Sequence, residues 1–162
     1  MQGIRMFKNG KIHDVVIREL TKFVDDRGWL TELYRKDEIP EQFAPVMAYI
    51  SLTLPDVARG PHEHAEQADY FGFIGPSDFK IFLWDNRPAS PTYMVRQIVY
   101  AGENIPRTVV IPPGVVHAYK NVGGKTGMVI NLPNALYAGK EKKQPVDEIR
   151  HETDPHSPFL LE

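Results

Sequence analysis

Three histidines and one aspartate stand where they could do chemistry together. His62, His64 and Asp69 lie within one short stretch, and His117 lies in a second segment at residues 112–121. On a strand, alternate side chains point to the same face, so His62 and His64 are expected to point the same way. Three imidazoles and a carboxylate in one cavity would form a metal site, an acid–base site, or both.

A metal held by these four side chains would be one that accepts nitrogen and oxygen ligands. Imidazole and carboxylate suit divalent Zn, Fe, Mn, Co and Ni, and such a set leaves positions open for substrate or water. Asp69 is shorter than a glutamate by one methylene, which limits its reach toward a metal. The alternative is that the histidines hydrogen-bond to one another or to a buried anion without metal.

Short strands must position these residues, because the chain has little room for long helices. Fourteen prolines and twelve glycines are spread along it, and both residues interrupt helices. Helical turns are expected only at 35–43 and 141–150, and an extended tail is expected after 151. Many short strands at fairly even spacing predict an all-β sandwich or barrel. The expected strands are rich in Val, Ile, Phe, Tyr and Thr and lie at residues 47–54, 70–74, 79–84, 94–99, 108–111 and 127–132.

Composition narrows the class of protein further. The chain has 162 residues, a formal net charge of -2 and no cysteine. Its length predicts one domain over residues 1–162, and without a long basic run there is no basis for nucleic-acid binding. No apolar stretch approaches the ~18–20 residues that span a bilayer, so no membrane partner is expected. The start of the chain does not resemble a signal peptide, and the lack of cysteine fits a cytoplasmic location.

The two histidine segments resemble the two signature motifs of the cupin family. The first motif of that family is His-x-His followed by an acid, and the second is Pro-x-Gly followed by a histidine and an asparagine. The corresponding segments here read His62-x-His64-x4-Asp69 and Pro112-x-Gly114-x2-His117-x3-Asn121. The resemblance implies a double-stranded β-helix, or jelly roll. Asp69 departs from it, because the family usually has glutamate there.

A wider resemblance covers about residues 20–155. It rests on residues 25–32, 51, 59–62, 67, 84–87, 90–93, 111–114 and 117. In order and spacing they resemble the thymidine-diphosphate-4-dehydrorhamnose 3,5-epimerase family, a cupin branch. The resemblance implies that His62 is the general base that removes a proton beside a keto group. It also implies that Arg27, Glu32 and Arg59 hold the nucleotide diphosphate, for which the planar arginine fork is suited, and that N-terminal strands are exchanged in a homodimer.

Several family positions are changed in this chain. The family lysine that polarises the keto oxygen is replaced by Asp69, which would oppose the negative charge of an enolate. The family's proton-donating tyrosine falls at about Ile130, and polar positions near the substrate become Met47 and Tyr49. A divalent cation at His64 and Asp69 could polarise the carbonyl in place of the lysine, as a Lewis acid.

The first functional interpretation is therefore an epimerase or isomerase of a 4-keto sugar nucleotide. In it His62 is the base, His117 is a second catalytic or ligand group, and Tyr137 replaces the lost proton donor or stacks on the nucleobase. Tyr49 and Tyr119 are expected to contact the substrate as walls of the pocket. The alternatives are a metal-dependent cupin enzyme that uses all four clustered residues on another small substrate, and a non-catalytic module that binds sugar nucleotides.

Overall fold

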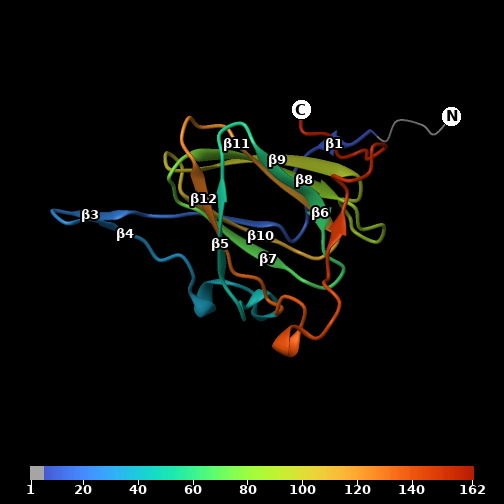
Figure 1. Ribbon diagram of the computed structural model, residues 1–162, viewed down its shortest axis with the longest axis horizontal. Helices are drawn as coiled ribbons and strands as arrows, with labels where there is room; N and C mark the ends of the chain where they lie inside the picture. The colour runs from blue at the N-terminus through green and yellow to red at the C-terminus, as the bar shows by residue number, and fades with distance from the viewer. Residues whose placement is uncertain (1–5) are drawn as a thin grey trace.

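The computed structural model describes residues 6–162, which form two β-sheets packed face to face (Figure 1). One sheet has the order β1-β9-β8-β11-β6-β13 and the other has the order β2-β10-β7-β12-β5. The strands of the first are β1 (Lys8–Asn9), β6 (Ala58–Glu63), β8 (Asp78–Asp85), β9 (Val95–Gly102), β11 (Val115–Asn121) and β13 (Ile149–Arg150). Those of the second are β2 (Val16–Glu19), β5 (Tyr49–Thr53), β7 (Asp69–Phe73), β10 (Arg107–Ile111) and β12 (Gly127–Asn131). The predicted all-β fold class is confirmed.

The core lies between the two sheets and follows the alternation of each strand. In β8, Phe79, Ile81 and Leu83 are buried in the inner core. The alternate residues Phe82 and Trp84 face the other way and are covered by Phe159 from the end of the chain. Both faces of the middle of β8 are therefore protected from water, which fits the unbroken apolar run from Ile81 to Trp84.

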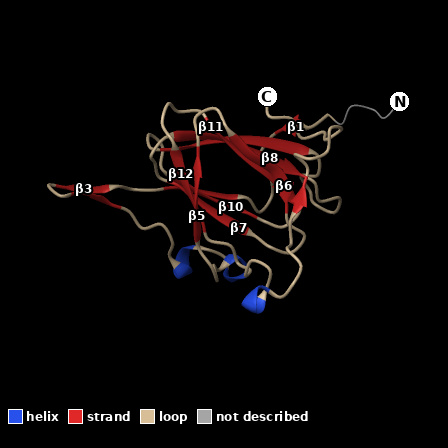
Figure 2. Ribbon diagram, viewed as in Figure 1, coloured by secondary structure: helices blue, strands red, loops and turns tan. Residues whose placement is uncertain are grey.

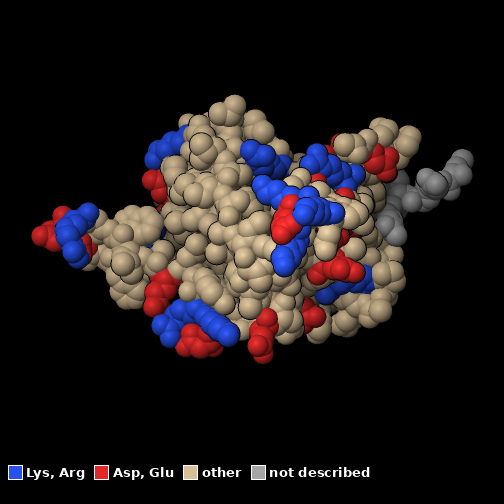
Figure 3. Space-filling view, turned by 60° about the horizontal axis from the view of Figure 1, so that its bottom comes forward, with Lys and Arg blue, Asp and Glu red and all other residues tan. Residues whose placement is uncertain are grey.

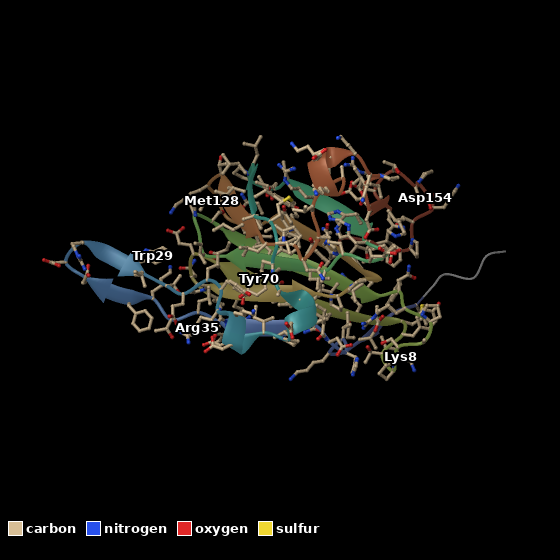
Figure 4. The ribbon with its side chains drawn as sticks, turned by 90° about the horizontal axis from the view of Figure 1, so that it is seen from below. Lys8, Trp29, Arg35, Tyr70, Met128 and Asp154 are labelled. Atoms are coloured by element: carbon tan, nitrogen blue, oxygen red, sulfur yellow. The ribbon has the colours of Figure 1, made fainter. Side chains whose placement is uncertain are left out.

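A two-stranded hairpin projects from the sandwich (Figure 1). It is formed by β3 (Phe23–Asp25) and β4 (Gly28–Leu30), which pair in antiparallel fashion. Trp29 lies on this hairpin, far from the middle of the sandwich where Tyr70 lies (Figure 4), and is 48% exposed. Trp29 therefore belongs neither to the core nor to the lining of the cavity described below, because its segment leaves the body of the chain.

Within residues 6–162, helical structure is limited to three short 3-10 turns (Figure 2), which are η1 (Lys36–Glu38), η2 (Glu41–Phe43) and η3 (Lys140–Lys142). The first two confirm helical turns within residues 35–43. The prediction of a helix over 141–150 is wrong beyond the first residues, because Ile149 and Arg150 form a strand with Glu63 and His62 of β6. Residues after 151 form turns rather than an extended tail.

Asn121, the last residue of the second cupin-like motif, is structural in this fold. Its buried side chain donates to the carbonyl oxygens of Thr53 and Lys125 and accepts from the Ser77 hydroxyl and the Gly123 amide. Replacing it with alanine leaves these groups without partners, at about 1–3 kcal/mol for each one that stays buried. We expect Asn121→Ala to lower the free energy of unfolding by about 3 kcal/mol in urea melts. Exposed Val122→Ala is the matched control, and equal stability of the two variants would contradict the assignment.

Candidate active site

A cavity of about 1030 Å³ opens between the two sheets. The first sheet contributes Arg59 and His62 of β6 to its wall, and the second contributes Tyr49 and Ser51 of β5. Residues 134–139 and 144–148, which connect β12 to β13, line its rim. The cavity therefore has one wall from each sheet and a rim from late in the chain.

The four residues singled out in the sequence converge beside this cavity: His62 and His64 line its wall, and Asp69 and His117 are buried next to them. One ligand atom from each of His62, His64, Asp69 and His117 lies within 4.8 Å of the others. His62 and His117 are paired across the antiparallel strands β6 and β11, and their ring centroids are 4.4 Å apart. Because β6 ends at Glu63, His64 reaches the cluster from the following loop rather than from the strand.

A glycine allows β6 and β11 to approach closely at this point. Gly60 has a φ of +82°, which favours glycine, and a Cβ there would lie 2.5 Å from the carbonyl oxygen of His117. The ladder between the two strands is irregular between His117 and Tyr119. The Arg59-Gly60 sequence thus brings His62 against His117.

The proton positions of two rings follow from their backbone partners. Nδ1 of His117 donates to the carbonyl oxygen of Val115 at 3.0 Å, and Nδ1 of His64 donates to that of Asp147. A carbonyl oxygen only accepts, so both Nδ1 atoms carry hydrogen. The two Nε2 atoms then face Oδ2 of Asp69, at 3.0 Å from His64 and 3.1 Å from His117. An unprotonated Nε2 would point its lone pair at a carboxylate oxygen, so a proton or a cation must lie between.

The other oxygen of Asp69 already accepts two hydrogen bonds. Oδ1 accepts from Nε2 of Gln67 at 2.8 Å and from Nδ2 of Asn131 at 2.9 Å. Asp69 is 1% exposed. Its carboxylate is therefore held in one orientation, with Oδ2 directed at the two imidazoles.

Charge separates the roles of the histidines. Burial lowers the pKa of His62, and the neighbouring imidazoles of His117 and His64 lower it further, to about 2. Burial would also lower the pKa of His64, but the hydrogen bond and the negative charge of Asp69 raise it to about 9. Burial opposes ionisation of Asp69, yet its contacts with His117 and His64 hold its pKa well below the ordinary value. His62 is thus neutral at pH 7, as a general base must be.

The donor set fits a divalent transition metal. Nε2 of His117 is buried and, within residues 6–162, has no hydrogen-bond partner, because its contact with Asp69 is not aligned for one. This nitrogen faces Oδ2 of Asp69 at 3.1 Å, so a cation could lie between the two atoms. Three imidazole nitrogens and one carboxylate oxygen match the preferences of Zn, Fe, Mn, Co or Ni. The cluster could hold such an ion.

Asp147 is a site residue that the sequence did not reveal. Its carboxylate accepts the backbone N–H groups of Ala65, Glu66 and Gln67, each at 2.8 Å, while its carbonyl oxygen fixes the ring of His64. One residue late in the chain therefore holds the loop between His64 and Asp69. An acid in a polar segment gives no local signal of this role.

Glu63, which follows His62 on β6, is a charged residue that is only 7% exposed. It lies on the face of β6 opposite to His62, accepts from Asn86, and contacts Nε2 of His151 at 2.8 Å. His151 therefore helps to hold the last part of the chain against β6.

Four of the residues predicted to contact substrate line the cavity. They are Arg59, Tyr49, Tyr119 and Tyr137. Arg59 donates to Thr53 and to the carbonyl oxygen of Leu52, which holds its guanidinium at the wall. Tyr137 lies on the loop after β12 and is 56% exposed. The structure thus brings these side chains together with the histidine cluster.

Arg27 and Glu32 are not part of this cavity. Arg27 lies at the tip of the projecting hairpin and pairs with Asp25 at 2.5 Å, and Glu32 pairs with Arg35 at 3.2 Å. Neither residue is among those that line the cavity of its own chain. Their predicted role in binding diphosphate stays a prediction that requires a second chain.

The sequence profile of the dTDP-4-dehydrorhamnose 3,5-epimerase family matches residues 9–148 of this chain. The chain belongs to this family. It is 35% identical to the probable low-salt glycan biosynthesis epimerase Agl13 of Haloferax volcanii over 128 residues, which cover 78% of this chain and 81% of that one. It is also 33% identical to the spore coat polysaccharide biosynthesis protein SpsL of Bacillus subtilis over 141 residues, which cover 85% and 91%.

Solved structures share the jelly-roll fold of this epimerase family. A dTDP sugar isomerase from Desulfovibrio desulfuricans matches with a TM-score of 0.79 at 21% identity, over 93% of this chain and 90% of that one. NovW, a 4-keto-6-deoxy sugar epimerase from Streptomyces spheroides, matches with a TM-score of 0.75 at 22% identity, over 92% and 75%. The predicted cupin jelly roll is confirmed.

Membership of the epimerase family makes this protein a nucleotide-sugar epimerase. The predicted family and enzyme class are thereby confirmed, while the roles of individual residues are not tested by the comparisons. Across residues 6–162, no helix is long and apolar enough to cross a membrane.

Proposed function

We propose that the protein epimerises a 4-keto-6-deoxy sugar carried on a nucleoside diphosphate, with His62 as the base. The observation that carries this is a neutral imidazole in a cavity between two sheets, in a chain of this family. A proton on carbon beside a ketone is removed by such a base, and the electron pair passes to the carbonyl oxygen.

Solvent exchange tests the proposal directly. The protein is incubated in D2O with thymidine-diphosphate-4-keto-6-deoxyglucose, and deuterium at carbons 3 and 5 is followed by NMR. Deuterium at either carbon supports the proposal. Binding of the nucleotide sugar without deuterium uptake would instead identify a binding module that has no epimerase activity.

We assign His64, Asp69 and His117 as the residues that would hold a divalent metal beside the base. All three are buried, whereas His62 is only half-buried, and within residues 6–162 no hydrogen bond fixes the ring of His62. A nitrogen bound to a metal cannot accept a proton, so His62 is kept as the base. When bound, the ion would polarise the substrate carbonyl as a Lewis acid. If His62 were a fourth ligand, the four-residue cluster would favour the alternative of a metal-dependent cupin enzyme with another small substrate.

A homodimer would complete the site with residues of the projecting hairpin. Phe23 and Leu30 on the hairpin and Ile50 and Leu52 on the edge strand β5 are all at least 58% exposed. Charges of the hairpin gather at its tip, and its remainder is uncharged (Figure 3). Pairing of these apolar surfaces between two chains would remove them from water and would bring Arg27 of the partner subunit near a cavity. The expected cytoplasmic location and the expected lack of nucleic-acid and membrane partners stay predictions.

A charge on the exposed face of β5 is expected to break this dimer. Leu52→Glu would place a carboxylate in an apolar interface, where an unpaired charge is strongly unfavourable. We expect a dimer for the natural chain and a monomer for the variant in sedimentation velocity runs. Val122→Glu, at another exposed apolar position, is the control and is expected to stay dimeric. A natural chain that sediments as a monomer would contradict the prediction.

A further inference from the structure

The hydroxyl of Tyr49 is held by an amide whose orientation is settled by its neighbours. Oδ1 of Asn131 accepts the backbone N–H of Tyr70 at 3.2 Å. Its Nδ2 donates one hydrogen to Asp69 at 2.9 Å and the other to the oxygen of Tyr49 at 2.8 Å. Both amide hydrogens are therefore used, and the Tyr49 oxygen is an acceptor in this contact. Its own hydrogen is taken by none of residues 6–162 and is free for a molecule in the cavity.

Tyr49 and His62 lie on opposite walls of that cavity. His62 is on β6 of the six-stranded sheet, and Tyr49 is on β5 of the five-stranded sheet (Figure 1). A sugar ring bound between the sheets would present one face to the imidazole and the other to the phenol. Inversion at carbon needs one proton to leave from one face of the ring and another proton to arrive at the opposite face. An imidazole and a phenol on opposite walls meet this need.

The other phenols of the cavity are less suited to donate a proton. The hydroxyl of Tyr119 is 2.9 Å from the hydroxyl of Ser51, which can accept its hydrogen, whereas Tyr49 has no such acceptor within residues 6–162. Tyr137 is more than half exposed at the rim. Ile130 is paired with Ile50, whereas the adjacent Asn131 is paired with Tyr49 across β12 and β5. The family tyrosine that would fall at about Ile130 on β12 is absent, but Tyr49 supplies a phenol on the neighbouring strand β5.

We infer that Tyr49 is the catalytic proton donor, acting on the face of the sugar opposite His62. This inference rests on the proposed epimerase function. His62 takes the proton as the carbon–hydrogen bond breaks, and the electron pair of that bond forms an enolate with the carbonyl group. The enolate carbon then takes the proton of the Tyr49 hydroxyl on the other face, and the ketone is restored. The Tyr49 phenolate regains a proton from water, and the His62 imidazolium loses one to water.

The electrostatic setting keeps the phenol protonated before the reaction. Burial of the hydroxyl and the negative charge of Asp69 raise the pKa of Tyr49 to about 12. The group is therefore a neutral donor at pH 7. The Asn131 amide that donates to its oxygen would also stabilise the phenolate formed when the proton leaves.

Tyr49→Phe tests the inference by separating exchange from inversion. In D2O with thymidine-diphosphate-4-keto-6-deoxyglucose, we expect the variant to exchange hydrogen at the reacting carbon with retention of configuration. Inversion is expected to fall by at least about 100-fold, the lower range for loss of a general acid. Tyr49→Gln is a second variant, because an amide oxygen can accept from Asn131 but cannot transfer a proton. Tyr100→Phe, on the exposed outer side of β9, is the matched control and keeps both rates.

The outcomes distinguish failure of this inference from failure of the proposed function. If the natural enzyme inverts and both Tyr49 variants invert at the same rate, only the role of Tyr49 is overturned. The same holds if Tyr137→Phe, rather than Tyr49→Phe, loses inversion while exchange continues. If the natural protein neither exchanges nor inverts, the epimerase proposal and this inference fall together.

Discussion

Replacing His62 with alanine is expected to lower the rate of solvent-deuterium incorporation into a 4-keto sugar nucleotide by at least about 100-fold. General-base catalysis by a positioned side chain contributes about 10²–10⁴-fold, and within the cluster His62 is the half-buried ring whose pKa, about 2, keeps it neutral. Its environment also predicts that its own protonation does not limit the rate between pH 5 and 8. The initial rate is measured by proton NMR across that range.

The loss of exchange in His62→Ala can be assigned to the chemical step only if the variant still binds the nucleotide. Affinity for thymidine diphosphate, followed by calorimetry, is expected to change by less than about threefold in His62→Ala, because Arg59 and the cavity rim remain. His156→Ala, in the exposed tail, serves as the histidine control. A His62→Ala protein that exchanges deuterium at the natural rate would remove this residue from the mechanism.

Local sequence patterns were sufficient to predict the centre of the site. The two motifs are 55 positions apart at His62 and His117, yet the cupin-like spacing placed both on strands of one jelly roll. An antiparallel pair then sets them side by side. The prediction that His62 and His64 point the same way assumed that both lie on one strand, but β6 ends at Glu63, one residue before His64. The loop still brings His64 to Asp69.

The residues that hold the cluster in place could not be predicted in the same way. Asp147 is 83 positions from His64, and its contacts depend on the path of the chain after β12. Its carboxylate binds backbone N–H groups, which every residue has, so no complementary side-chain pattern marks the pair. Asn131 is similar, because its amide orientation follows from the backbone of Tyr70.

The hairpin shows a different limit of local patterns. Val24 and Trp29 are strand-forming residues, and they pair with each other in the hairpin although no strand was predicted there. Their burial was not predictable, because an isolated two-stranded hairpin has no core of its own. In the proposed dimer, a second chain would bury these side chains.

Replacing Asp69 with asparagine is expected to weaken binding of Co²⁺ by more than about 100-fold. Changes in groups that only orient metal ligands typically cost 10–100-fold, and Asp69 would be a direct ligand with Oδ2 facing His64 and His117. Titrations followed by visible absorption, with a competing chelator, give the dissociation constants. At a Co²⁺ concentration of 100 times the dissociation constant, the natural protein is expected to gain about 2.7 kcal/mol of stability.

Two further variants decide which residues hold the ion. Asp154→Asn, in an exposed turn of the tail, should bind Co²⁺ as the natural protein does. His62→Ala should also retain it if His64, Asp69 and His117 are the ligands and His62 is the free base. Loss of Co²⁺ in His62→Ala would make that imidazole a fourth ligand and favour the metal-dependent alternative. A natural protein that binds no Co²⁺ would leave protons between Asp69 and the two imidazoles, because a bare lone pair cannot face that carboxylate.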